Sequence, residues 1–313
     1  MITIITEPSL NKIYYLKKRM KNFIKKNILK KDIVKYSGHY AVVRSLLEGL
    51  DIINYSYNYN PSTTSKCYDH MHVLANVEAL KMAIQLKKSG KIKRLTAGPN
   101  IVISSADENG IVGSPEIDKY FVNSDWTISA YTLDNPNLKG KIDKWPAGVN
   151  PNQWNIVKTT TEKPIALFYK KRPEYHIYEH CKISAEKAGY EVKEIICGEF
   201  SHEDFKKELQ KANVVIFFVE QESQGIALQE IWATNTPTYV WNPGIWMYKN
   251  VNYACTSAPY LTDKTGKFFR TKEEFDSLIN QPISTSFEPR KWIMENMTDE
   301  ICARDFIKKT SQE

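Results

Sequence analysis

The feature that most constrains the fold is a short apolar run followed by a polar loop and then by a helical pattern. Residues 214–219 are all apolar, residues 220–225 are polar and end in Gly225, and residues 226–234 have the spacing of a helix. A short apolar run bounded by a turn is typical of a strand buried on both faces, as in a parallel sheet. Because ligands bind beyond the carboxyl ends of parallel strands, the loop 220–225 is a candidate binding site.

Apolar runs alternate with helical patterns along the whole chain, which predicts an α/β fold with parallel sheets. The predicted strands are residues 1–6, 51–57, 73–74, 94–97, 117–124, 165–169, 190–197, 214–219 and 238–241. The predicted helices are residues 10–31, 41–50, 77–88, 175–188, 202–210 and 226–234. Residues 145–150 and 159–162 have the composition of linkers. A chain of 313 residues predicts two domains.

The composition favours a soluble protein inside the cell. Apolar residues make up 42% and charged residues 25%, which is ordinary for a globular protein. No stretch reaches the ~18 apolar residues that a membrane span needs, and no basic leader precedes the apolar residues 1–6. The five cysteines are scattered without a Cys-x-x-Cys pair, which predicts free thiols. We therefore expect a cytoplasmic protein.

The positive charge is concentrated in the first half of the chain. Residues 1–150 hold 22 basic and 13 acidic residues, and ten of the basic ones lie between Lys12 and Lys35. This asymmetry predicts an anionic partner or, equally, a solvated helix face. The predicted helix 10–31 has an apolar side and a cationic side, so an anionic membrane surface is one candidate partner and would place the protein peripherally at the membrane. No nucleic-acid-binding motif accompanies the charge, and we expect no nucleic-acid partner.

The loop and helix of residues 220–234 have the groups to bind a phosphorylated sugar. The N–H groups and the dipole at a helix start suit a phosphate, and Gly225 lets the backbone approach it. Glu222 lies before the helix and Glu230 about one turn inside it. Carboxylates accept hydrogen bonds from hydroxyls and are poor phosphate ligands. We therefore expect one carboxylate to contact a ribose and the other a transferred sugar.

A basic cluster follows another predicted strand. Lys170, Lys171 and Arg172 come directly after residues 165–169, at the carboxyl end of the first strand of the second half. Cations at this position can balance the charge of a departing diphosphate.

Several motifs together resemble retaining GT-B glycosyltransferases of family 4. The specific one is the donor-site signature, with Glu222, Gly225 and Glu230 followed by Ala233 and by Thr236-Pro237. Weaker landmarks occur in the family's order, namely residues 37–38, 124–126, 146–150 and 290–296. The last of these resembles the closing helix that crosses back to the first domain. Where the family often has a histidine, this chain has Gly98-Pro99-Asn100.

The resemblance implies a GT-B fold, in which two Rossmann-like domains with parallel sheets face a central cleft. It implies an acceptor-side domain over residues 1–150, a nucleotide-sugar domain over 151–285 and a closing helix over 286–313 that packs on the first domain. The implied activity is transfer from a UDP- or GDP-sugar to a glycan, lipid-linked or other acceptor, with retention of configuration and with no metal or cofactor.

The resemblance also assigns residue roles. The implied catalytic residues are Glu222, Lys170 and Lys171. The implied donor-binding residues are Arg172, Gly198, Phe200, Ser223, Gln224, Gly225, Ile226 and Glu230. The implied acceptor-side residues are Gly38, His39 and Asn100.

Three other interpretations compete with the transferase. His176, Glu179 and His180 match the inverted zinc-protease pattern, in which two histidines on a helix hold a metal. His70 and His72 form a possible metal pair, although strand packing explains them better. A non-catalytic module that binds a nucleotide sugar or a glycan is the rival from another class.

Overall fold

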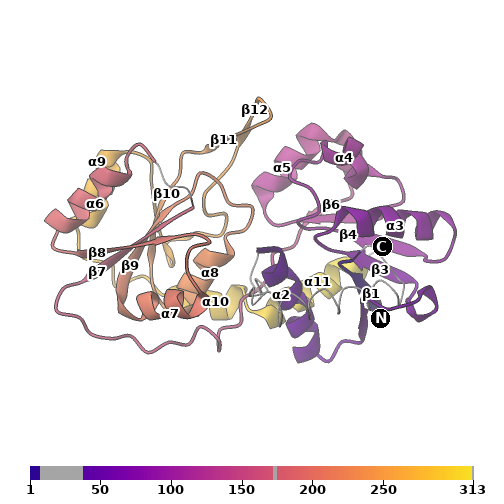
Figure 1. The fold of residues 1–313 in the computed structure, drawn as a ribbon, viewed down its shortest axis with the longest axis horizontal. Coiled ribbons are helices and arrows are strands. Elements are labelled where there is room, and N and C mark those ends of the chain that lie inside the picture. The colour runs from indigo at the N-terminus through magenta and orange to yellow at the C-terminus, as the bar shows by residue number, and fades with distance from the viewer. Residues whose placement is uncertain (8–37, 172–174, 312–313) are drawn as a thin grey trace, which may run out of the picture. The chain divides into compact units, whose positions relative to one another are not determined.

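The structure is a computed structural model that describes residues 1–7, 38–171 and 175–311. The predicted helix 10–31, the basic segment Lys12–Lys35 and Arg172 lie outside these residues. The chain forms two compact units. The first contains residues up to Gly148 and those from Asp299 on, and the second spans Val149–Thr298 (Figure 1). Within the described ranges, no helix has the length and apolarity needed to cross a membrane.

The first unit is built on a parallel sheet, which has six strands among the described residues, in the order β2-β1-β3-β4-β5-β6. The strands are β1 (Ile2–Ile5), β2 (Tyr57–Tyr59), β3 (His70–Val73), β4 (Arg94–Ala97), β5 (Lys119–Val122) and β6 (Ile142–Lys144). The helices are α2 (Gly38–Ile52), α3 (Val77–Lys88), α4 (Asp107–Gly110), α5 (Asp125–Asp134) and α11 (Asp299–Ser311). Short 3-10 turns cover Thr64–Lys66, Ile111–Gly113 and Pro136–Leu138.

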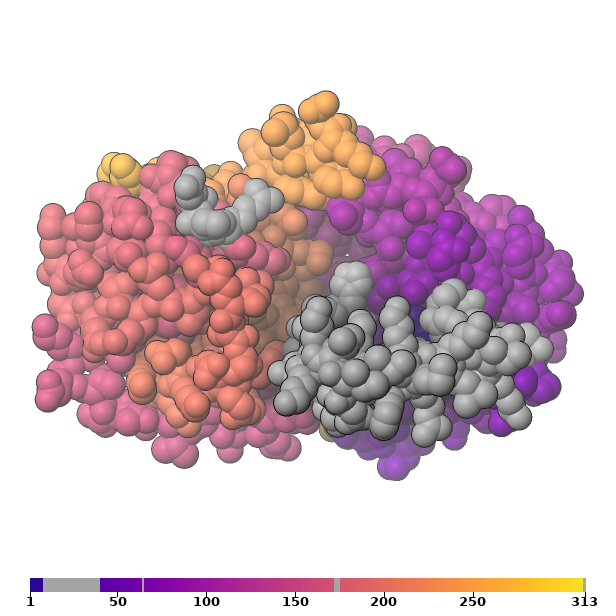
Figure 2. All heavy atoms as spheres, in the orientation of Figure 1, coloured from indigo at the N-terminus to yellow at the C-terminus, as the bar shows by residue number. Residues whose placement is uncertain are grey.

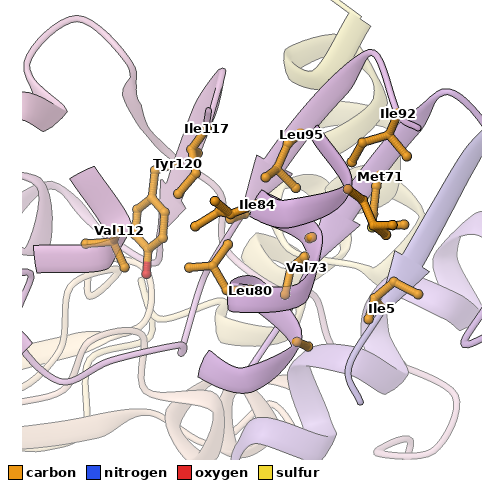
Figure 3. Packing of buried hydrophobic residues seen from close by; sticks show 14 of the residues in the cluster. Ile5, Met71, Val73, Leu80, Ile84, Ile92, Leu95, Val112, Ile117 and Tyr120 are labelled. Atoms are coloured by element: carbon orange, nitrogen blue, oxygen red, sulfur yellow. The ribbon is translucent and has the colours of Figure 1, made fainter. Parts of the chain in front are cut away.

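One face of this sheet packs against α3 in a continuous apolar core. Alternate strand residues such as Met71, Val73 and Leu95 are fully buried against Leu80 and Ile84 of the helix (Figure 3). Asn76 caps the start of α3 by accepting a hydrogen bond from the Ala79 amide at 2.9 Å. The apolar spacing and the cap explain why the sequence predicts this helix with its correct bounds.

The other face of the sheet is covered by α11, which returns to the first unit after the chain has built the second. Phe306 of α11 packs against His72 and Trp145, with ring centroids 4.7 and 5.1 Å apart. α11 also lies beside α2 (Figure 1), where a Cβ on Gly49 would stand 2.3 Å from the Asp299 carbonyl oxygen. Only a residue without a side chain allows this close approach of the two helices.

Only the later part of the implied closing segment 286–313 belongs to the first unit, and the landmark 290–296 does not. Residues 290–296 form most of α10 (Pro289–Asn296), which packs against α8 (Ile226–Ala233) inside the second unit. Arg290 fixes α10 there by donating to the Pro151 carbonyl at 3.1 Å and to the Ala233 carbonyl. The helix that crosses back begins at Asp299 instead.

Two histidines of β3 share one hydroxyl beneath α11. His70 Nε2 and His72 Nδ1 lie 3.0 and 2.9 Å from Thr96 Oγ1 of the neighbouring strand. The single hydroxyl proton of Thr96 can be donated to only one ring, so the other ring must donate to the oxygen. Burial lowers the pKa of His70 to about 4, with the nearby Arg94 adding to the shift, and burial lowers the pKa of His72 well below its usual value. Both histidines are therefore neutral structural residues, as strand packing predicts.

We expect the first unit to lose stability in acid through His70. Its pKa is about 4 in the folded chain and about 6.5 when unfolded, so the unfolded state takes up the proton first. The free energy of unfolding is therefore unaffected by the titration of His70 above about pH 6.5. It decreases by about 3 kcal/mol as the pH falls from about 6.5 to about 4. Urea denaturation measures the free energy of unfolding of the wild type and of His70→Gln. The wild-type value minus the variant value should decrease as the pH is lowered from about 6.5 to about 4. A difference that does not change between pH 7 and pH 4 would contradict the assignment.

The second unit contains a parallel sheet in the order β13-β10-β9-β7-β8 and a separate two-stranded hairpin, both within the described residues. The sheet strands are β7 (Ile165–Lys170), β8 (Glu191–Ile196), β9 (Ala212–Phe218), β10 (Thr238–Trp241) and β13 (Gly266–Phe269). The helices are α6 (Tyr178–Lys187), α7 (His202–Lys211), α8, α9 (Lys272–Ile279) and α10.

Helices cover both faces of this second sheet (Figure 1). Phe168, Ile216 and Phe218 point to the face packed by α6 and α9. The alternate residues Tyr169 and Phe217 point to the other face, where their rings stack at 4.6 Å near Phe205 of α7. This two-residue alternation determines which side chains at the ends of the strands can meet.

One predicted strand is wrong and several elements were not expected. Residues 51–57 do not form a strand, because α2 continues through Ile52 and the next strand begins at Tyr57. Asn54 ends the helical region with a left-handed backbone, φ 54°. The elements α5, α9, β6 and β13 and the hairpin of β11 (Ile245–Tyr248) and β12 (Val251–Ala254) had no prediction.

Candidate functional site

The predicted site loop lies at the carboxyl end of β9, and hydrogen bonds from residues 256–257 fix its backbone. Ser257, which follows the hairpin, is fully buried and donates to the carbonyls of Val219 at 2.6 Å and Glu220 at 3.2 Å. The Glu222 amide donates to the Thr256 carbonyl at 3.0 Å. These bonds fix the backbone of the loop just ahead of Glu222. Nothing in the sequence pattern singled out Ser257, because its role depends on a contact between distant segments.

Gly225 forms the junction between this loop and α8. It is the N-cap residue and has a left-handed backbone, φ 82°, which a side chain would strain. Leu228 and Gln229 both donate to the Gly225 carbonyl, at 3.0 and 3.2 Å. The N–H groups ahead of them, including that of Ile226, have no acceptor within the described helix and are available to an anion. Ser223 is half-buried just before this junction.

Lys171 and Glu222 form an ion pair across the ends of β7 and β9. Lys171 Nζ lies 2.7 Å from Glu222 Oε1. The Lys171 amide donates to the Phe218 carbonyl at 3.2 Å, so the register of the two strands brings these residues together. An ammonium group has three donors and the pair uses one of them. Lys171 can therefore retain Glu222 while it binds an anionic oxygen.

Glu230 faces a histidine that the sequence did not single out. Its Oε1 lies 3.6 Å from Nε2 of His202, the first residue of α7. The His202 ring lies 5.8 Å from the buried indole of Trp154. His202 and Trp154 therefore form one side of the space around Glu230.

Tyr169 is a buried phenol whose pKa both carboxylates influence. Burial raises the pKa of the Tyr169 phenol far above its usual value, and Cys197, Glu222 and Glu230 raise it further. Both acids of the signature thus influence the pKa of the same phenol, and their roles toward a ligand stay predictions.

The loop after β8 borders the same region. Phe200 lies 6.1 Å from the Tyr169 ring and 5.1 Å from that of Phe205. Gly198 has a left-handed backbone, φ 90°, and open space where a Cβ would stand. Phe200 thus lies on the Tyr169 side of the sheet and presents a half-buried ring there.

Lys170 lies on the opposite face of the sheet from this cluster. As the last residue of β7, it alternates with Tyr169 and points toward α6. Its Nζ lies 4.5 Å from the Tyr178 ring and 3.5 Å from Glu194 Oε2. Glu194 also binds Lys182, so Lys170 belongs to a structural cluster on α6. The structure separates the two neighbouring lysines that the sequence groups together.

Gln224 turns inward rather than toward a ligand. It is buried, and its side-chain amide donates to Gln229 Oε1 at 3.1 Å. Its contribution to a ligand would come from the backbone.

The predicted acceptor-side residues all belong to the first unit. Gly38 and His39 are the first residues of α2. Asn100 has a left-handed backbone, φ 65°, in the turn after β4. Gly98 precedes it so close to β5 that a Cβ would meet the Phe121 carbonyl oxygen at 2.1 Å.

The zinc-protease pattern does not form a metal site. His176 lies in the turn before α6, which begins at Tyr178, so the two histidines do not share a helix. His176 packs 5.7 Å from Trp241, His180 lies 3.0 Å from Asp276, and Glu179 lies 3.7 Å from Lys182. Across the described parts of the chain, no three His, Cys, Asp or Glu side chains converge to hold a metal ion.

The two-unit architecture is that of the GT-B glycosyltransferases, and the GT-B fold predicted from the sequence is confirmed. The sucrose-phosphate synthase of Thermosynechococcus elongatus matches with a TM-score of 0.64 and 12% identity, over 98% of this chain and 97% of that one. WaaG, a glycosyltransferase of lipopolysaccharide biosynthesis, matches with a TM-score of 0.54 and 10% identity over 100% of both chains. Anabaena HepE, solved with UDP-glucose, matches with a TM-score of 0.51 and 11% identity over 99% of both. No protein-family model and no curated protein matches the sequence.

Proposed function

We propose that this protein is a glycosyltransferase that uses a nucleotide sugar as its donor. The observation that carries the proposal is the cluster at the carboxyl edge of the second sheet. There the Lys171–Glu222 ion pair lies at the ends of β7 and β9, Gly225 begins α8, and α8 carries the Glu230 carboxylate. A cation and free amides suit a diphosphate, and flanking carboxylates suit hydroxyl groups. The complex of HepE with UDP-glucose supports a donor of this class.

Each residue has a distinct role in the proposal. Glu230 accepts hydrogen bonds from the ribose, Glu222 from the donor sugar, and Phe200 with Gly198 borders the base. The backbone from Ser223 to Ile226 binds the diphosphate, and Lys171, with Arg172 beside it in the sequence, neutralises its charge. No metal or cofactor is required, because Lys171 and the helix start supply the positive charge.

The proposed reaction retains the anomeric configuration. The acceptor hydroxyl attacks the anomeric carbon on the face from which the nucleotide leaves. The carbon–oxygen bond to the diphosphate breaks, and the leaving phosphate oxygen takes the proton of the acceptor. The protein contributes orientation and charge stabilisation rather than a dedicated base. We propose a glycan or a lipid-linked acceptor, bound on the side of the first unit, and a cytoplasmic location.

A thermal-shift screen against UDP, GDP and their common sugar conjugates tests the donor class. A ligand that binds only the folded protein at about 100 times its Kd adds about 2.7 kcal/mol of stability. We expect one nucleotide family to raise the Tm of the wild type and not that of Glu230→Ala, and ATP to be inactive. Failure of every sugar nucleotide to raise the Tm would end the proposal. Tight binding with no glycosyl product against any glycan or lipid acceptor would instead identify a non-catalytic binding module.

A further inference from the structure

The hairpin of the second unit is a separate ribbon with two distinct faces. β11 and β12 pair antiparallel, with Ile245 opposite Ala254 and Tyr248 opposite Val251. Lys249 and Asn250 form the turn with left-handed backbones, φ 48° and 64°, as a tight two-residue hairpin requires. Within the described residues, neither strand pairs with the five-stranded sheet. The hairpin is therefore a two-stranded ribbon separate from that sheet (Figure 1).

One face of the hairpin is aromatic and internally packed. The Trp246 ring lies 5.1 Å from that of Tyr248 and 5.4 Å from that of Tyr253. Because two-stranded hairpins are marginal on their own, these ring contacts help to keep the ribbon rigid.

The opposite face is apolar and open to solvent. Ile245 and Met247 are 60% and 69% exposed, which places them among the most exposed large apolar side chains of the described chain. They share this face with Ala254 and Asn252, which are also exposed. Ile245 and Met247 lie two residues apart on one strand, so both project from the same face of the ribbon.

The hairpin lies in a segment almost without charge. Between Glu230 and Asp263 the sequence has a single charged residue, Lys249 at the hairpin turn. A ribbon that exposes aliphatic side chains on one face, lacks acidic groups and has a lysine at its turn is suited to the interface of a lipid bilayer. There aliphatic side chains enter the acyl boundary while basic ones stay at the level of the headgroups.

We infer that the β11–β12 hairpin is a membrane-contact element that inserts Ile245 and Met247 into a bilayer surface. A second copy of this chain is a poorer partner, because a stable protein interface uses about 20–30 residues on each side and this face has four positions. Figure 2 shows the hairpin side chains, in orange, standing at the molecular surface. The inference does not depend on the donor site.

Vesicle co-sedimentation of the full chain tests the inference. The vesicles are phosphatidylcholine alone and phosphatidylcholine mixed with phosphatidylglycerol, each at low salt and at about 1 M salt, where screening removes charge-driven binding. We expect the wild type to bind at both salt concentrations. The double variant Ile245→Ser/Met247→Ser should bind about tenfold or more weakly at high salt, because two apolar side chains no longer leave water. The matched control is Ile183→Ser/Met294→Ser, which alters two apolar residues of the same unit that are 50% and 48% exposed. It should bind like the wild type.

A second measurement tests directly whether the hairpin lies close to the lipid. Brominated lipid should quench tryptophan fluorescence in the wild type, and part of this quenching should disappear in Trp246→Phe. Equal vesicle binding by the wild type and the Ile245/Met247 double variant at high salt would overturn the inference. So would a wild type that binds only at low salt, since contact would then depend on charge alone. A dimer in sedimentation velocity that the double variant dissociates, without any lipid binding, would also overturn it and would identify a self-association face.

Discussion

Replacing Lys171 by alanine is expected to lower kcat by about 10²–10³-fold while the fold survives. The Nζ of Lys171 lies 2.7 Å from Glu222 Oε1, in the loop that precedes α8. In the proposed reaction, negative charge develops on the leaving diphosphate, and the loss of one well-placed stabilising group costs about 3–4 kcal/mol of transition-state stabilisation. Steady-state kinetics with the donor found by thermal shift measures the effect. Glu230→Ala should act mainly on kcat/KM, because a ribose contact exists before and during the reaction.

The controls for this prediction are matched by exposure and pairing. Lys193 is 44% exposed and pairs with Glu191, much as Lys171 is 43% exposed and pairs with Glu222, but it lies on β8 away from the loop. Lys193→Ala should retain normal turnover. Glu179→Ala should also remain active, and its inactivity together with bound zinc would revive the metallopeptidase. Unchanged turnover in both Lys171→Ala and Glu230→Ala would rule out the site assignment.

Replacing Arg44 by methionine is expected to destabilise the first unit by about 3–5 kcal/mol, the usual cost of removing one partner from a buried ion pair. Arg44 of α2 lies 3.0 Å from Asp299 at the start of α11, and the Asp299 side chain is only 1% exposed. Burial raises the pKa of Asp299, and the Arg44 guanidinium pulls it back toward the ordinary range. The pair thus contributes little net stability at neutral pH, yet its loss leaves a buried carboxylate without its cation. Urea denaturation monitored by circular dichroism measures the change.

Asp299→Asn should cost less than Arg44→Met, because Arg44 keeps a second partner. Its guanidinium also lies 2.7 Å from Glu48. Arg304→Met is the matched control, since Arg304 lies on α11 and pairs with Glu300 at 2.9 Å but is 63% exposed. Exposed pairs of this kind contribute about 0.5 kcal/mol. An Arg44→Met variant as stable as Arg304→Met would show that the buried pair does not secure α11.

The sequence predicts the parts of the fold in which local pattern and tertiary burial agree. Residues 94–97, 77–88 and 238–241 have the predicted bounds, because each apolar pattern ends at a turn or a cap. The sequence likewise predicts the helix of the donor-site motif, which spans Ile226–Ala233. Its roles in donor binding stay predictions.

The remaining features depend on contacts between distant residues. Lys170 is the last residue of β7, so its side chain points to the face of the sheet opposite to Tyr169. The sequence pattern predicts the strand only to residue 169 and therefore does not separate Lys170 from Lys171. Ser257 and His202 meet the site only because β9, α7 and the end of the hairpin converge there. The segment 51–57 is apolar enough for a strand, but α2 extends into it from the preceding residues.

The late return of α11 has a consequence for synthesis on the ribosome. The second unit is one continuous stretch, Val149–Thr298, so all of its residues are made before α11 begins. The first unit cannot complete its interior until Phe306 and its neighbours follow, since they cover His72 and Trp145. At about 5–20 residues per second, translation of the second unit takes about 8–30 s. During that interval the earlier-made half lacks the helix that covers His72 and Trp145, so these side chains are exposed to other apolar surfaces.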